Sequence, residues 1–162
     1  MDDTIKIVLP KPHYTLFNAT REGLPEVISV NDALLSFPHA EIFPWHLRIS
    51  VKAKKLAENG MPTPGESKLL FKITDHLEDT ILNGVTEFGA QNAIFLARST
   101  WDGWRELYFY VHDPEIAHAA LQTLNEGGQH KRHWEYIMED DPQWTKAGYI
   151  FQLYPPVKGM TS

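Results

Sequence analysis

Two short-range pairs of residues in this chain have types and spacings that could do chemistry. His130 and His133 are spaced like two ligands of one metal ion, and Asp140 with Asp141 could act as an acid–base pair. A metal site needs three or four converging ligands, and the sequence places no further ligand close to the two histidines. Because Pro142 follows the two aspartates, capping of a helix is the simpler role for them. We therefore expect no metal site here.

Other catalytic patterns are missing from the sequence. The chain has no cysteine, which excludes disulfides, thiolate ligands and thiol nucleophiles. It also has no G-x-S-x-G, G-x-G-x-x-G or Walker sequence. We expect no catalytic residue and no cofactor. Because catalytic groups can converge from distant positions, the alternative is a hydrolase-type enzyme in which His46, Arg48 and Glu106 meet in a pocket.

One face of a predicted sheet is the best candidate for binding. Residues 43–53 alternate between apolar and polar side chains, which predicts a strand. Asp102-Gly103 is typical of a type I′ turn and predicts a hairpin over residues 93–111, with Trp101 opposite Trp104 and Phe95 opposite Tyr110. The polar face of the strand and one face of the hairpin then form a candidate binding face of eight residues. These are His46, Arg48, Lys52, Phe95, Trp101, Trp104, Tyr108 and Tyr110.

Aromatic rings beside cations suit single-stranded nucleic acid, because bases stack on rings and cations meet phosphates. The favoured interpretation is that the N-terminal residues and a C-terminal helix pack on this face and bury the rings. The net charge of −6 also disfavours nucleic acid and anionic membranes. It is compatible with a partner protein that is basic.

The remaining elements predict an α+β fold. Thr63, Glu66 and Pro64 predict the start of a helix over residues 64–88, and Asp113-Pro114 starts a second over residues 114–126. A strand over residues 132–139 and a short C-terminal helix follow. Strand, helix, strand, strand, helix, strand is the ferredoxin-like order, with both helices on one sheet face. We expect extra strands near residues 5–9, 14–17 and 27–30.

These elements predict a single domain over residues 1–162, with a core at 43–139, an N-terminal extension at 1–31 and a C-terminal helix at 141–154. The start of the chain is acidic and its apolar run is short, unlike a secretory signal. No stretch approaches the roughly 20 apolar residues of a membrane span. We expect a cytoplasmic protein, as a monomer or a homodimer.

The C-terminal segment resembles a known bacterial family. The resemblance rests on Asp140-Asp141-Pro142-Gln143-Trp144, Tyr149 and Leu153-Tyr154-Pro155, and further on Gly60-Met61-Pro62, Glu66, Asp75–Leu82 and Thr100–Val111. The family is the domain of unknown function numbered six hundred and ninety-five, often grouped with RraB-like proteins, which resemble the regulator that inhibits ribonuclease E. The resemblance implies a ferredoxin-like fold and no established catalytic residues.

By analogy with RraB, the resemblance suggests a small acidic protein that binds and restrains another protein. The leading hypothesis is therefore a non-catalytic regulatory domain acting on an enzyme such as a ribonuclease. An immunity protein that neutralises a bacterial toxin is the first alternative, because charge complementarity speeds the capture of a basic toxin. RNA binding through the aromatic face is the second alternative.

Overall fold

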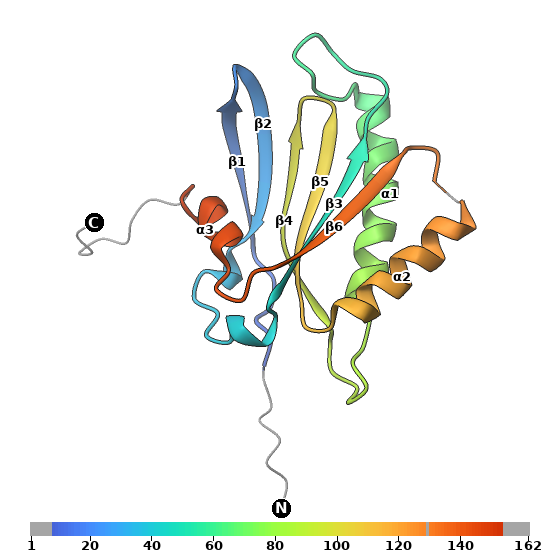
Figure 1. The fold of residues 1–162 in the computed structure, drawn as a ribbon. Helices are drawn as coiled ribbons and strands as arrows, with labels where there is room; N and C mark the ends of the chain where they lie inside the picture. The colour runs from blue at the N-terminus through green and yellow to red at the C-terminus, as the bar shows by residue number, and fades with distance from the viewer. Residues whose placement is uncertain (1–7, 129, 154–162) are drawn as a thin grey trace, which may run out of the picture.

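A computed structural model describes residues 8–128 and 130–153 of the chain. One six-stranded antiparallel sheet carries helices on both faces (Figure 1). The strands are β1 (Tyr14–Arg21), β2 (Leu24–Asn31), β3 (Trp45–Lys52), β4 (Ala93–Trp101), β5 (Trp104–Val111) and β6 (Trp134–Asp140). The helices are α1 (Pro64–Leu82), α2 (Pro114–Gly127) and α3 (Thr145–Phe151), and short 3₁₀ turns occupy Asp32–Leu34 and Ala40–Ile42. The predicted α+β class is confirmed.

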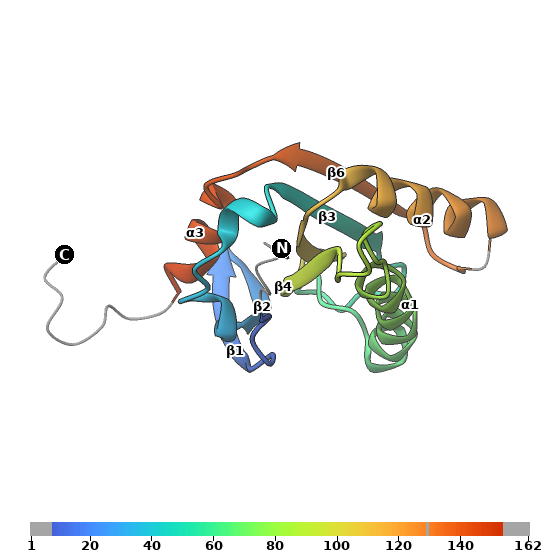
Figure 2. The ribbon, with the colours of Figure 1, turned by 90° about the horizontal axis from the view of Figure 1, so that it is seen from below.

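The strand order is β1-β2-β4-β5-β3-β6. Helices α1 and α2 pack on one face of the sheet, and α3 lies on the other (Figure 2). Because successive side chains of a strand point to opposite faces, the sheet has two apolar layers. Leu47, Leu107 and Phe109 belong to the layer under α1 and α2, whereas Tyr110 packs with Trp144 in the layer under α3.

Helix α1 begins where the sequence predicts and ends earlier. The Thr63 side chain accepts a hydrogen bond from the Glu66 amide, and Pro64 is the first helical residue. The predicted extension to residue 88 is wrong, because the helix ends at Leu82 and the chain then forms a loop. Phe88, which fits the helical period, is almost fully exposed in this loop. Helical spacing alone therefore overestimated the length.

The Asp102-Gly103 turn has a positive φ at both residues, as a type I′ turn requires. The predicted register holds from the Trp101–Trp104 pair to the Ala97–Tyr108 pair. A β-bulge then shifts it, so Phe95 lies opposite Phe109 and not opposite Tyr110. One extra residue in a strand turns the following side chains to the other face. The placement of Phe95 on the candidate binding face was therefore wrong; its ring packs under α1 and α2.

The N-terminal hairpin extends the sheet. Strands β1 and β2 include the two strands predicted near residues 14–17 and 27–30, and β2 pairs with β4. The predicted strand at 5–9 lies partly outside the described residues, and the described residues of that segment, Val8 and Leu9, are not in a strand. Among the described residues, no helix combines the length and apolar character needed to cross a membrane.

Candidate functional site

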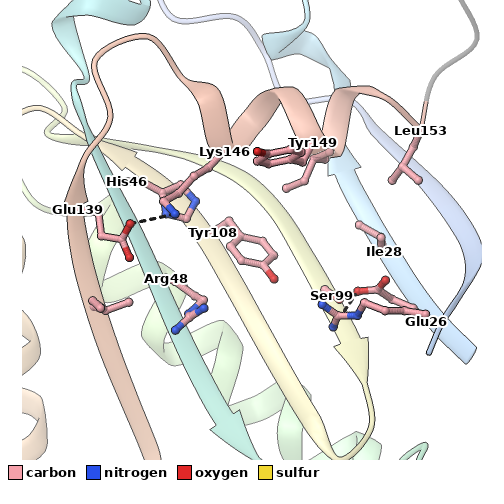
Figure 3. A pocket seen from close by; sticks show the side chains of 13 residues that line it. Glu26, Ile28, His46, Arg48, Ser99, Tyr108, Glu139, Lys146, Tyr149 and Leu153 are labelled. Carbon is pink, nitrogen blue, oxygen red and sulfur yellow. Dashed lines mark hydrogen bonds and ion pairs between the residues drawn. The ribbon is translucent and has the colours of Figure 1, made fainter. Parts of the chain in front are cut away.

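A cleft of about 400 Å³ lies between α3 and the sheet face that α1 and α2 leave open (Figure 3). Side chains from all six strands and from the α3 segment line it, so the cleft extends across the whole sheet. We call it the α3 cleft. Its lining residues are Arg21, Glu26, Ile28, His46, Arg48, Ser99, Tyr108, Ile137, Glu139, Lys146, Tyr149, Ile150 and Leu153.

The register brings seven of the eight predicted binding-face residues to this side of the sheet. His46, Arg48 and Tyr108 line the α3 cleft itself. Lys52 lies opposite Trp104 at the end of the sheet where the β4–β5 turn is. Tyr110, at the other end, is fully buried under α3.

The rings at the α3 end of this face contact each other. Trp144 stacks on Tyr110 with their ring centroids 4.2 Å apart and an interplanar angle of 11°. The Trp144 Nε1–H donates to the Phe43 carbonyl, and the Tyr110 hydroxyl donates to Asp141 Oδ2 at 2.7 Å. The His46 ring meets the edge of Tyr110 at 5.2 Å. These contacts attach α3 to the sheet and occupy rings that a nucleic-acid base would need.

The rings at the turn end contact cations of the same chain. The Arg21 guanidinium lies 3.9 Å from the Trp101 ring centroid, and the Trp101 Nε1–H donates to the Arg21 carbonyl at 2.9 Å. Lys52 lies over Trp104 at 5.9 Å. Cation–π contacts of this kind contribute about 0.5–1 kcal/mol at exposed sites. The contacts with Arg21 and Lys52 therefore stabilise the positions of the Trp101 and Trp104 rings.

The two carboxylates that line the α3 cleft each contact a cation. Glu26 lies 3.3 Å from Arg21 and accepts a 2.6 Å hydrogen bond from the Ser99 hydroxyl. Lys146 lies 2.9 Å from Glu139. Because the Ser99 hydroxyl donates to a carboxylate that is already paired, this arrangement differs from that of an activated serine nucleophile.

Glu106 has three side-chain partners on this face. Arg48 Nε lies 3.5 Å from its carboxylate, and the hydroxyls of Ser50 and Tyr108 donate to it at 2.7 and 3.0 Å. Burial, followed by the charge of Glu106, raises the pKa of Tyr108 well above its usual range. The phenol therefore stays protonated as a hydrogen-bond donor at neutral pH.

His46 is the most buried ionisable side chain of the α3 cleft, with 5 % of its surface exposed. Within residues 8–128 and 130–153 its ring nitrogens make no hydrogen bond to the protein. Burial and, second, the charge of Lys146 lower the pKa of His46 to about 4. The imidazole is therefore neutral at pH 7, with one nitrogen able to accept a hydrogen bond and one able to donate.

The low pKa of His46 predicts a pH dependence of stability. The ordinary value is 6.5 and the folded value is about 4, so the unfolded chain binds more protons between these limits. We expect the contribution of this residue to be complete above pH 6.5 and to fall as the pH drops to about 4. Urea titrations of the wild type and His46→Gln across this range measure it. Equal pH slopes for the two proteins would contradict the assignment.

The length of the sequence match decides the family. The sequence pattern of a family of unknown function, DUF695, matches residues 13–153. The chain belongs to the DUF695 family. No curated protein matches it, and no solved structure does either.

The sequence motif through which the chain resembles DUF695 surrounds the α3 cleft. Asp141 accepts hydrogen bonds from the Thr145 and Lys146 amides at 2.9 and 3.0 Å, which confirms its capping role. Asp140 ends β6 and Pro142 lies in the turn that follows it. Of the remaining motif residues, Trp144 packs on the sheet, and Tyr149 and Leu153 line the cleft. Tyr154 and Pro155 lie outside the described residues.

His130 and His133 contact different residues. His130 Nε2 lies 3.2 Å from His76 Nδ1, and His133 lies 3.5 Å from Glu135. In the described part of the chain, no three side chains of the metal-ligating types come together. The structure therefore does not join His130 and His133 into one site.

Sequence reasoning missed several lining residues, among them Arg21, Glu26, Glu139 and Lys146. Arg21 and Glu26 come from the N-terminal hairpin, whose place in the sheet is set by its pairing with β4. A sequence signal existed for Lys146, because it lies one turn after the Asp141 cap on the predicted C-terminal helix. Glu139, the ion-pair partner of Lys146, alternates with the apolar Met138 in β6. This alternation could have assigned Glu139 to the sheet face opposite Met138.

Proposed function

We propose that this DUF695 protein is a non-catalytic domain that binds and regulates another protein, and that a segment of the partner occupies the α3 cleft. The observation that carries the proposal is the combination of internally paired charges with exposed apolar side chains. Tyr149 is 70 % exposed and Ile137 is 44 % exposed, and both line the cleft. An apolar side chain of the partner would be buried against them.

The protonation states in the cleft support binding rather than acid–base catalysis. General acids and bases work best with a pKa near the operating pH. Burial moves the pKa of His46 down to about 4 and raises that of Tyr108, so both move away from neutrality. Glu106, Ser50 and Arg48 are engaged with one another. A lining of paired charges beside a neutral imidazole and a protonated phenol suits the recognition of peptide groups by hydrogen bonds.

The net charge of −6 supports a basic partner. Complementary charge raises association rates and excludes partners of like charge. A nucleic-acid-binding enzyme such as a ribonuclease meets this description, and so does a basic toxin, so the immunity hypothesis remains the alternative. RNA itself is the weaker candidate, because Tyr110 lies under Trp144 and Trp101 lies under Arg21.

We propose further that β3 to β6, with α1 and α2, form a ferredoxin-like unit. The order of these four strands is β4-β5-β3-β6, and neighbouring strands in it are antiparallel. The order of the complete sheet differs from a four-stranded ferredoxin-like sheet, because β1 and β2 extend it beyond β4. A ferredoxin-like unit of this kind would support the analogy with RraB-like regulators.

The proposal is tested by site-specific photo-crosslinking in native lysate, with a benzophenone amino acid in place of Tyr149. The matched control carries the same group in place of Gln122, an exposed residue of α2 on the other side of the sheet. We expect one stoichiometric protein adduct at position 149 and none at position 122. Equal labelling at both positions, or no adduct at 149, would overturn the proposed site.

The identified partner is then purified and its affinity measured by calorimetry. We expect Tyr149→Ala to weaken binding by about tenfold, as for an aromatic residue at the centre of an interface. Gln122→Ala should leave the affinity unchanged. An affinity that does not depend on Tyr149 would place the partner elsewhere on the molecule.

A further inference from the structure

A second cleft of about 380 Å³ lies on the opposite face of the sheet, between α1 and the β1–β2 hairpin. We call it the arginine cleft. Phe71 and Ser67 of α1 form one wall, and the side chains of Leu16, Val27 and Ser29 form the other. Met61 and Pro62 close one end, and Arg98, Thr100 and Arg105 of β4 and β5 form the floor.

Arg105 is a buried cation that contacts no carboxylate within residues 8–128 and 130–153. Only 4 % of its surface is exposed. Its guanidinium donates to the Thr100 hydroxyl at 3.1 Å, to the Ser67 carbonyl at 3.4 Å and to the Ser67 hydroxyl at 3.2 Å. These acceptors are all neutral. Neutral dipoles therefore make all the hydrogen bonds of the Arg105 guanidinium that the structure describes, and the Asp75 carboxylate acts on its charge without contact.

Arg98 brings a second guanidinium to the same floor. Its Nη2 lies 3.3 Å from Glu78 and 3.5 Å from Asp75, whereas its buried Nε has no hydrogen-bond partner among the described residues. Both guanidinium groups lie over the Phe71 ring, Arg105 at 4.3 Å and Arg98 at 5.3 Å. One aromatic ring thus brings two cations together beside an open cavity.

This arrangement is costly for the protein alone. Burial, and second the charge of Arg98, lower the pKa of Arg105 to about 10, because both disfavour its cationic form, and the charge of Asp75 offsets only part of this. A buried charge without a counter-ion in contact reduces stability. An oxyanion in the cleft would supply a counter-charge in direct contact with the Arg105 guanidinium. Guanidinium donors match the geometry of carboxylate and phosphate oxygens better than a lysine does.

We propose that the arginine cleft binds a small organic anion, in which a carboxylate or phosphate group contacts Arg98 and Arg105. The unpartnered Arg98 Nε–H and the Ser67 hydroxyl would donate to the anion. Val27, Met61 and Phe71 would contact its apolar part. A volume of about 380 Å³ is sufficient for a small ligand, since ligand pockets span roughly 300–1,000 Å³.

The site is independent of the proposed partner cleft. The two clefts share no lining residue and lie on opposite faces of the sheet. Because the lining residues are separate, binding of the anion can be tested with the isolated full chain, whether or not a partner protein is known. Strands β2 and β4 contribute to both clefts, so an anion held in the arginine cleft would contact strands that also line the α3 cleft.

The test is a titration of the full chain with phenyl phosphate, inorganic phosphate and phenol, followed by the ¹H–¹⁵N resonances of the arginine Nε–H groups. We expect phenyl phosphate to shift the Arg98 and Arg105 signals saturably, most strongly Arg98 Nε–H, which gains an acceptor. Phenol should shift neither signal. Inorganic phosphate should bind about tenfold more weakly, because it lacks the apolar contact. Sodium benzoate serves as the carboxylate probe.

Variants separate a specific site from general charge attraction. Arg98→Gln should weaken phenyl phosphate binding at least tenfold, and Leu16→Trp should weaken it by narrowing the mouth of the cleft without removing a charge. Lys72→Gln removes an equal charge from the exposed side of α1 and should have no effect. Signals that do not saturate with any of the anions, or equal weakening by Lys72→Gln, would overturn the proposal.

Discussion

Replacing Glu66 by alanine is expected to destabilise the fold by about 3–5 kcal/mol, the usual cost of removing one partner of a buried ion pair. Glu66 is 2 % exposed and its carboxylate accepts two hydrogen bonds from Arg132, at 2.8 and 2.6 Å. It also accepts a 2.6 Å bond from the Lys54 amide. One carboxylate thus joins the start of α1 to the segments after β3 and before β6. Urea denaturation followed by circular dichroism measures the loss.

The same pair has a signature at low pH. The hydrogen bonds from Arg132 lower the pKa of Glu66 to about 2, from an ordinary value of 4.5. A carboxylate with a lowered folded pKa contributes stability above its unfolded value, so this contribution should disappear as the pH falls from 4.5 to about 2. Glu58→Ala, in the exposed loop before α1, is the matched control. Equal losses for the two variants would contradict the expected role of Glu66.

The second large effect is expected for Trp144→Ala, which should cost about 3–5 kcal/mol as other buried Trp-to-Ala changes do. The indole is 7 % exposed, stacks on Tyr110 and donates to the Phe43 carbonyl. Without it, the start of α3 loses its stacking contact with β5. We expect the amides of residues 145–151 to exchange with deuterium much faster in this variant, as in a locally unfolded segment.

Trp104→Ala is the control for Trp144→Ala. Trp104 lies on the same sheet face but is only half-buried, with Lys52 over its ring. Its removal should cost about 1 kcal/mol and leave exchange in α3 unchanged. If α3 exchanged at the wild-type rate in Trp144→Ala, the helix would be held by contacts other than this ring.

Much of the fold could be predicted because local signals were strong. Alternation identified β3, and the Asp102-Gly103 turn placed most pairs of the β4–β5 hairpin correctly. The bulge could not be seen, because Ile94, Phe95 and Leu96 are all apolar and either face accepts them. The alternation that normally fixes a register is uninformative in such a run.

The candidate site was only partly accessible to sequence reasoning. Residues of β3 and β5 were assigned to one face correctly, but no local pattern shows that Trp144 packs on Tyr110. The arginine cleft was missed for a different reason. The same hairpin register places Arg105 opposite Thr100, on the side of α1. Two charged residues directed toward a helix-covered face were the available signal.

The strand order also has a consequence for how the chain is made. Strand β2 ends at Asn31, but its partner β4 begins only at Ala93. A hairpin such as β1–β2 forms within microseconds, whereas pairing between distant segments is slow. During synthesis the edge of β2, with the apolar side chains of Ile28 and Val30, therefore stays unpaired until β4 has left the ribosome. Over that interval the nascent hairpin offers an unpaired strand to other chains.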